Sequence, residues 1–123
     1  MAYDEDLASR VRECLAGEPV GAITEQPMFG GLAFLVNGNM AVAVSHRGGL
    51  LVRLAPAEAE KALTKPHTEQ MVLAGRPSRG WVFVPAEGLR TSRQLVPWVE
   101  RGAAYARNLP PKKPKRRRPA TLS

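Results

Sequence analysis

MFGGLAFLVNGNMAVAVS, residues 28–45, carries the clearest structural signal in the chain. Two apolar runs, 32–36 and 40–45, flank the tripeptide Asn37-Gly38-Asn39. Asn-Gly between apolar runs is typical of a tight β-hairpin, because the turn requires positive φ angles that both residues tolerate. The first run is apolar at every position, so the hairpin presents apolar side chains on both faces of its sheet.

The second arm of the hairpin sorts its side chains by size. The larger residues at 40, 42 and 44 point to one face, and the small residues Ala41, Ala43 and Ser45 point to the other. A face of small side chains lets a helix pack closely, so we expect a helix on that side of the sheet.

Further strands are expected on both sides of the hairpin. The segment Ile23–Phe29 gives a weaker strand signal because Pro27 interrupts it. Gly30-Gly31 then indicates a bend or a bulge. The remaining strands are predicted at 50–54, 71–73 and 81–84, with a turn at 46–49 and a loop at 75–80.

Three segments have helical periodicity. Asp4 can cap a helix over residues 4–16, and Pro56 fits the first position of a short helix that reaches residue 64. A third helix lies within 91–108, where Pro97 is expected to sit in the first turn or to shorten the helix. The apolar stripes of the first and third helices are Leu7, Val11, Cys14 and Leu15, and Leu95, Val99, Ala103 and Ala106.

The order of elements is therefore helix, three or four strands, helix, two strands, helix. Hairpin connections favour an antiparallel sheet, and helices outside it indicate a two-layer α+β sandwich of order α-β-β-β-α-β-β-α. The predicted domain covers residues 1–109. Residues 110–123 are rich in Pro, Lys and Arg and are expected to form a disordered basic tail.

Charge is distributed unevenly along the 123 residues. Lys and Arg number 18 and Asp and Glu 11, which gives a net charge of +7. Without the basic cluster of the tail, 12 basic residues face 11 acidic ones, so the predicted domain is almost neutral. That cluster consists of Lys112, Lys113, Lys115, Arg116, Arg117 and Arg118.

The sequence predicts a cytoplasmic location and no membrane contact. Acidic residues follow the first methionine, where a secretory signal would carry positive charge and an apolar run. No stretch approaches the ~18 apolar residues of a membrane span. The lone cysteine, Cys14, excludes an intramolecular disulfide and is expected to stay reduced.

We expect no catalytic residues, no metal and no cofactor. Cys14 lies on an apolar helix stripe. His46 and His67 lie in loops, and no acidic residue stands near either at a spacing typical of a catalytic or metal site. Glu58 and Glu60 are two residues apart, so they do not share a helix face. The glycine pairs form neither a dinucleotide-binding fingerprint nor a phosphate-binding loop.

Three features are candidates for binding to a partner. Arg53, in an apolar strand, either reaches solvent or serves an ion pair, an interface or an anion site. Arg76, Arg79 and Trp81 could bind an acidic or nucleic-acid partner, or could belong to an ordinary solvated turn. The basic tail predicts contact with the phosphates of DNA or RNA without sequence preference, its alternative being an incidental solubilising segment.

Four blocks resemble the N-terminal domain of the TfoX/Sxy family over about residues 1–110. They are MAYDEDLASRVRECL at 1–15, MFGGLAFLVNGNMAVAV at 28–44, GRPSRGWVFV at 75–84 and LVPWVERGAAYARNLPPKK at 95–113. The resemblance implies a bacterial protein with a two-layer α+β fold similar to that of secretion-chaperone-like domains. The resemblance supplies no catalytic residues. Its motif residues fit a structural role as well as a functional one; they are Met28, Phe29, Gly30, Gly31, Gly75, Gly80 and Trp81.

The best-known members of that family regulate natural competence and act with the cyclic-AMP receptor protein at promoters. They carry a second, C-terminal domain, where this sequence has the basic tail. The resemblance and the segregated charge together predict a non-enzymatic module that binds a transcription factor or another protein and assists transcription. The alternative is a chaperone-like or homodimeric protein-binding domain, favoured by the double-sided apolar hairpin, and an unrecognised enzyme is a third reading.

Overall fold

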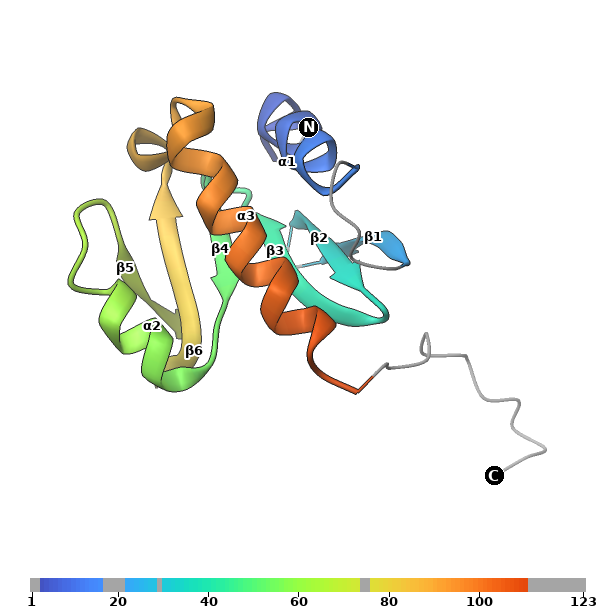
Figure 1. Cartoon of the computed structure of the whole chain (residues 1–123). Helices are drawn as coiled ribbons and strands as arrows, with labels where there is room; N and C mark the ends of the chain where they lie inside the picture. Colours follow the sequence, from blue (N-terminus) through green and yellow to red (C-terminus); the bar gives the residue numbers. More distant parts are fainter. Residues whose placement is uncertain (1–2, 17–21, 29, 74–75, 111–123) are drawn as a thin grey trace.

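A computed structural model describes residues 3–16, 22–28, 30–73 and 76–110, with the backbone alone for 71–73 and 76–79. All three helices lie on one side of a single sheet (Figure 1), which confirms the predicted α+β class. The elements are α1 (Glu5–Ala16), β1 (Ile23–Met28), β2 (Gly31–Val36), β3 (Asn39–Val44), β4 (Gly49–Arg53), α2 (Pro56–Ala62), β5 (Glu69–Leu73), β6 (Arg76–Pro85), η1 (Ala86–Leu89) and α3 (Ser92–Arg107).

The sheet has six strands in the order β1-β2-β3-β4-β6-β5, and every neighbouring pair is antiparallel. Four strands precede α2, one more than in the predicted order with three. The additional strand is β1, whose signal Pro27 had weakened. The predicted end of that strand, Phe29, lies outside the described residues.

Pro27 is compatible with β1 because its nitrogen faces the open edge of the sheet. The N–H of Asn37 donates to the carbonyl of Ala22 over 2.8 Å. Hydrogen-bonded positions alternate along an antiparallel strand, so residues 22, 24, 26 and 28 hydrogen-bond to β2, whereas Pro27, whose register partner is Leu32, does not. A proline lacks only the donor that would have pointed to solvent, which is why edge strands tolerate it.

The central hairpin has the predicted turn, with φ of 52° at Asn37 and 83° at Gly38. The next residue, Asn39, is a buried polar side chain at 7% exposure. Its Nδ2 donates to the carbonyl of Pro110 over 2.9 Å and to that of Ala106 over 3.5 Å. The hairpin end therefore holds the end of α3 and the residues that follow it.

The predicted loop over 75–80 is wrong from Arg76 onward, because the backbone there is already strand β6. Leu73 pairs with Arg76 and Val72 with Pro77, so β5 and β6 form a tight hairpin. Gly80 has a φ of 85° and still extends the ladder, since its carbonyl accepts from the N–H of Leu54 over 2.8 Å. A glycine that signals a loop in the sequence is here a bend inside a long strand.

Helix boundaries follow local capping. Asp4 accepts from the N–H of Leu7 over 3.1 Å, as expected for a cap. Thr91 and Gln94 form a reciprocal capping box that starts α3 at Ser92. Pro97 is then the sixth residue of α3, beyond the first turn, so the expectation that it would shorten the helix is wrong. Proline has no N–H, so one carbonyl of the preceding turn loses its helical hydrogen bond. Because Pro97 is exposed, that carbonyl bonds to water instead.

The core lies between the helices and one face of the sheet. It contains the predicted helix stripes, except that Cys14 is half-buried and packs against it, together with the strand residues Leu32, Phe34, Val36, Ala41, Val42, Val44, Leu50, Val52, Val82 and Val84. Helix α3 therefore packs on Ala41, Val42 and Val44 of β3, so the predicted separation into a large and a small face fails at Ala41, where the register of β2 with β3 shifts. Ala43, between the two valines, lies on the opposite face as predicted. The close approach comes from the helix itself, because a Cβ on Gly102 would lie 2.6 Å from the carbonyl oxygen of Ala41.

Candidate functional site

Two of the four predicted partner-binding residues meet in the structure. Arg53 ends β4 and pairs in register with Trp81 of β6, and both side chains are half-buried. The guanidinium of Arg53 lies over the ring of Tyr105 of α3, 5.6 Å from its centroid. Arg76 and Arg79 lie on the same strand as Trp81, but their side chains are outside the described part of the chain.

The candidate catalytic residues are dispersed. Cys14 is half-buried and packs against the core, whereas His46 and His67 are exposed. Glu58 and Glu60 are exposed on α2. Within the described residues, no three His, Cys, Asp or Glu side chains lie close enough together to hold a metal ion.

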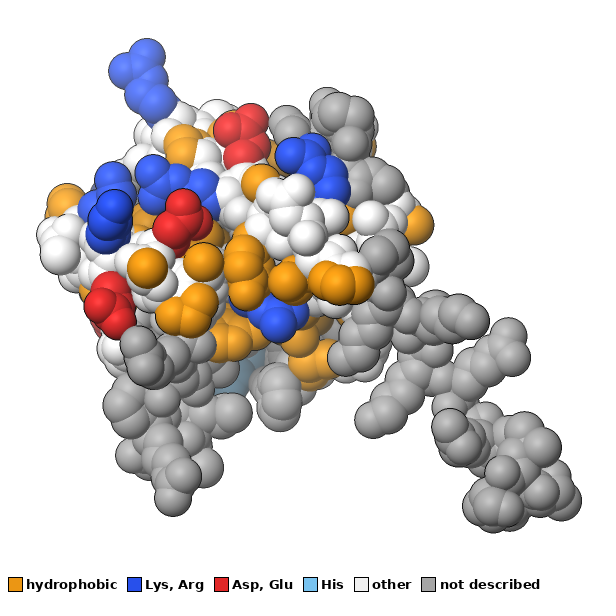
Figure 2. Space-filling view, turned by 60° about the horizontal axis from the view of Figure 1, so that its bottom comes forward, with side chains coloured by type: hydrophobic (Ala, Val, Ile, Leu, Met, Phe, Trp, Pro, Cys, Tyr) orange, Lys and Arg blue, Asp and Glu red, His pale blue; other side chains and the backbone are white. Residues whose placement is uncertain are grey.

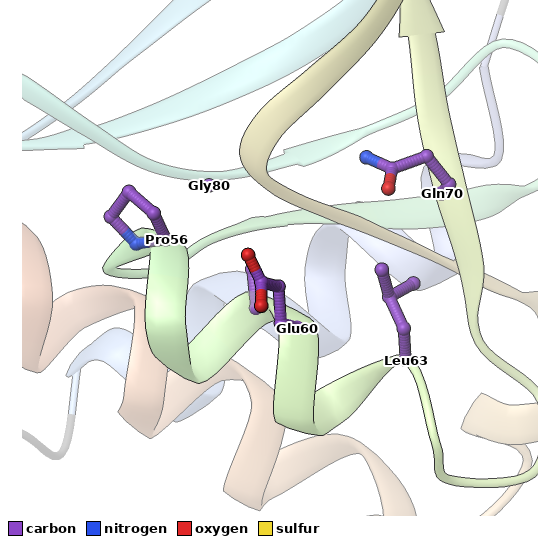
Figure 3. A pocket seen from close by; sticks show the side chains of 6 residues that line it. Pro56, Glu60, Leu63, Gln70 and Gly80 are labelled. Atoms are coloured by element: carbon purple, nitrogen blue, oxygen red, sulfur yellow. The ribbon is translucent and has the colours of Figure 1, made fainter.

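A small hollow lies between α2 and the strands beside it (Figure 3). Its volume is about 70 Å³, far below the ~300–1,000 Å³ that small-molecule sites occupy. Glu60 lies between Pro56 and Leu63 on the α2 side of the hollow, and Gln70 of β5 faces it from the strand side (Figure 3). A hollow of this size leaves no room for an organic ligand.

Ion pairing and cation–π contacts occupy several arginines. Arg12 of α1 donates to both carboxylate oxygens of Glu25 on β1, over 2.5 and 2.8 Å. The hydrogen bond from Arg12 holds the pKa of the Glu25 carboxyl below its ordinary value. The guanidinium of Arg47 lies 5.5 Å from the ring centroid of Phe83.

The sequence did not define the extent of the sheet face that lies away from the helices. Ala43, Leu51 and Phe83 are half-buried there, although no described helix covers them. Leu51 alternates with the core residues Leu50 and Val52 along β4, so it points to the opposite face. The double-sided apolar hairpin was the signal for this surface, but only the pairing of β4 with β6 extends it across the sheet.

The six basic residues at 112–118 lie outside the described residues, as does the predicted tail beyond Pro110. On the underside of the described surface, hydrophobic side chains gather in a band with a basic side chain among them (Figure 2). In the described ranges, no helix is both long and apolar enough to cross a membrane.

The fold and its sequence blocks agree with one known family. The family model for the TfoX N-terminal domain matches residues 13–106, which include the six described strands, α2 and all of α3 except its last residue. No curated protein matches the chain. The family match covers well over half of the 123 residues, so the chain belongs to the TfoX N-terminal domain family.

Proposed function

We propose that this chain is a non-enzymatic regulatory module that assists transcription and holds nucleic acid through its basic C-terminal segment. The carrying observation is the segregation of charge, because six of the 18 basic residues fall within residues 112–118 and the rest of the chain is almost neutral. A cluster of this density attracts polyanions and releases their counterions on contact. Membership of the TfoX N-terminal domain family supports the regulatory role.

The folded domain supports this proposal by fixing the point from which the basic segment starts. Asn39 holds the carbonyl of Pro110, two residues before Lys112. Near the same end of α3, the half-buried pair of Arg53 and Tyr105 adds a cation and an aromatic ring. A nucleic-acid strand bound by the segment would therefore meet a basic and aromatic surface on the domain.

The test is a titration of duplex DNA and of RNA over a salt series. The intact chain is expected to bind with a log–log salt slope of about −0.9 per phosphate contacted on duplex DNA, or about −5 if all six charges engage. A full-length variant with glutamine at all six basic positions is expected to lose most of this affinity. The proposal fails if the glutamine variant binds as tightly as the intact chain.

A matched control tests whether the affinity for nucleic acid depends on the clustering of the basic residues or only on the net charge of the chain. It replaces six exposed basic residues of the domain by glutamine and leaves the segment intact, which changes the net charge by the same amount. We expect it to keep most of the affinity, because scattered charges release fewer counterions at one site. The six control positions are Lys61, Lys65, Arg90, Arg93, Arg101 and Arg107.

The regulatory part of the proposal has its own test. The resemblance implies action beside the cyclic-AMP receptor protein, so the chain is added to a complex of that protein with promoter DNA. A slower-migrating ternary complex, retained at a salt concentration that removes non-specific binding, is the expected result. If the chain leaves the complex unchanged, the proposed role at promoters is wrong. Phosphate binding is tested independently by the salt titration.

A further inference from the structure

Two contacts between an arginine and an aromatic ring follow one another along a single stripe of α3. The guanidinium of Arg101 lies 5.5 Å from the ring centroid of Trp98. One turn further along the helix, Tyr105 has the guanidinium of Arg53 over its ring, 5.6 Å from the ring centroid. Positions 98, 101 and 105 are separated by three and then four residues, so they share one face of α3. We call Trp98, Arg101, Tyr105 and Arg53 the cation–aromatic row.

The cation–aromatic row lies beside the buried stripe of α3 and not within it. Trp98 and Tyr105 are half-buried, and Arg101 is exposed. Packing against the domain therefore holds the two rings in place and leaves part of their surface open to a ligand. The buried residues of α3 are Leu95, Val99, Gly102, Ala103 and Ala106.

Positive charge continues from the row into the basic segment. Beyond Glu100 the chain contains Arg101, Arg107 and the six residues of the basic segment, and it contains no acidic residue. Asn39 holds the carbonyl of Pro110 just past the end of α3 (Figure 1), so the segment starts at the C-terminal end of the row. A polyanion bound by the segment therefore meets no carboxylate side chain from this part of the sequence.

We propose that the cation–aromatic row binds the unpaired bases of a single-stranded nucleic acid while the basic segment holds its phosphates. This inference rests on the nucleic-acid binding proposed above and names a single strand, of DNA or RNA, as the preferred substrate. Unpaired bases stack on aromatic rings and on the planes of arginine guanidinium groups. Bases inside a duplex are stacked on one another, so their faces are closed to the row.

The spacing of the row fits a short stretch of strand. Trp98 and Tyr105 are seven residues apart in α3, which is about 10 Å along the helix axis. Successive nucleotides of one strand rise by about 3.4 Å when their bases are stacked, so about three or four nucleotides reach from one ring to the other. Each arginine over a ring offers a flat surface to a base and a charge to a phosphate, whereas a lysine would offer only the charge.

The first test compares two single strands that carry the same number of phosphates. One consists of about a dozen thymidines, and the other has the same backbone with abasic sugars throughout. The full-length chain is expected to bind the thymidine strand at least about 10-fold more tightly, because one stacked base contributes about this much. Equal binding of the two strands refutes base stacking and leaves phosphate binding by the basic segment intact. If neither strand nor duplex DNA binds, both proposals are wrong.

The second test uses a variant that conserves charge, together with a matched control. The double variant Arg53→Lys, Arg101→Lys removes both guanidinium planes and is expected to weaken binding of the thymidine strand about 5-fold or more, with duplex affinity unchanged. Arg47→Lys alters a third contact of the same kind, with Phe83 on the other face of the sheet, and is expected to change neither affinity. A double variant that binds the thymidine strand as tightly as Arg47→Lys overturns the proposal.

A strand of uridines of the same length tests the two possible sources of the single strand. Stacking on a ring does not involve the 2′-hydroxyl that distinguishes RNA from DNA. The double lysine variant is therefore expected to weaken binding of the uridine and thymidine strands by the same factor. A loss confined to one of the two strands overturns stacking as its cause.

A third measurement locates the bases without changing the protein. Under irradiation, 5-iodouracil in a single strand bonds to an aromatic ring that it stacks on and releases hydrogen iodide. Peptide mapping of the cross-linked full-length chain is expected to place the bond at Trp98 or Tyr105. Cross-links confined to other residues overturn the proposal, even if the strand with bases binds more tightly than the abasic strand.

Discussion

Replacing Gly102 by alanine tests whether contact between α3 and β3 determines the stability of the domain. A Cβ at this position would lie 2.6 Å from the carbonyl oxygen of Ala41 and 2.8 Å from Cγ1 of Val42. Ordinary contacts of a Cβ begin at 3.4 Å. The helix would therefore have to withdraw from the strand by about 0.8 Å, because a backbone oxygen in a central strand cannot move aside as a flexible side chain can.

Two effects of opposite sign set the size of the change. Alanine is favoured over glycine inside a helix by about 1 kcal/mol. Inserting a methyl group into a packed core costs about 1–3 kcal/mol, and a backbone obstacle puts Gly102→Ala at the upper end of that range. We therefore expect the free energy of unfolding to fall by about 2 kcal/mol, which lowers Tm by about 8 °C in a domain of this size.

Urea and thermal unfolding followed by circular dichroism measure this change. Ala104→Gly, two residues further along α3 at a half-buried position, measures helix propensity alone and is expected to cost about 1 kcal/mol. The sign of the change in unfolding free energy for Gly102→Ala is decisive. If position 102 had free space around it, alanine would raise the free energy of unfolding by about 0.5–1 kcal/mol. A variant more stable than the parent chain would show that α3 does not lie as close to β3 as described.

Three further predictions concern single contacts. Asn39→Ala is expected to lower the free energy of unfolding by about 2 kcal/mol, with faster amide exchange at the end of α3, and Asn39→Asp is expected to give no rescue because a carboxylate cannot donate to Pro110. Thr91→Ala removes the capping box and is expected to cost about 1 kcal/mol in thermal unfolding, whereas a loss of the same size in Thr91→Ser would contradict the capping role. Because the pKa of Glu25 is lowered in the folded state, its ion pair with Arg12 stabilises the domain above the ordinary carboxyl pKa, and this contribution disappears as the pH falls through the lowered value. Unfolding of the Glu25→Gln variant and the parent chain should therefore differ near neutral pH and converge in acid, and a difference that persists in acid would refute this assignment.

Local signals predicted the elements that depend on neighbouring residues. The Asn37-Gly38 turn, the cap at Asp4 and the stripe of α3 all follow from residues within a few positions of one another. The misplacement of Pro97 was avoidable, because Thr91 and Gln94 stand at the spacing of a capping box and set the start of the helix ahead of the proline.

The features that sequence reasoning missed depend on strands far apart in the chain. Pro27 weakened the signal for β1 because nothing near it shows that its nitrogen faces an open edge. The residues over 75–80 predicted a loop because glycine is typical of turns. In the structure Gly80 is instead a bend within a paired strand, which only the distant pairing partners reveal. The apolar sheet face away from the helices likewise extends to Phe83 only because β6 enters the sheet beside β4, which no periodicity in the sequence reveals.

The position of Pro27 also limits how the sheet can grow. Leu32–Val36 is an uncharged apolar run of the kind that stacks into cross-β aggregates, and β1 covers its free edge. The covering strand is itself a poor template, because its outward row lacks the donor of Pro27 and its Glu25 is drawn toward α1 by Arg12. Residues 23–28 therefore protect this edge, and an event that detaches β1 would leave the unpaired N–H and C=O groups of Leu32–Val36 open to strand pairing with another chain.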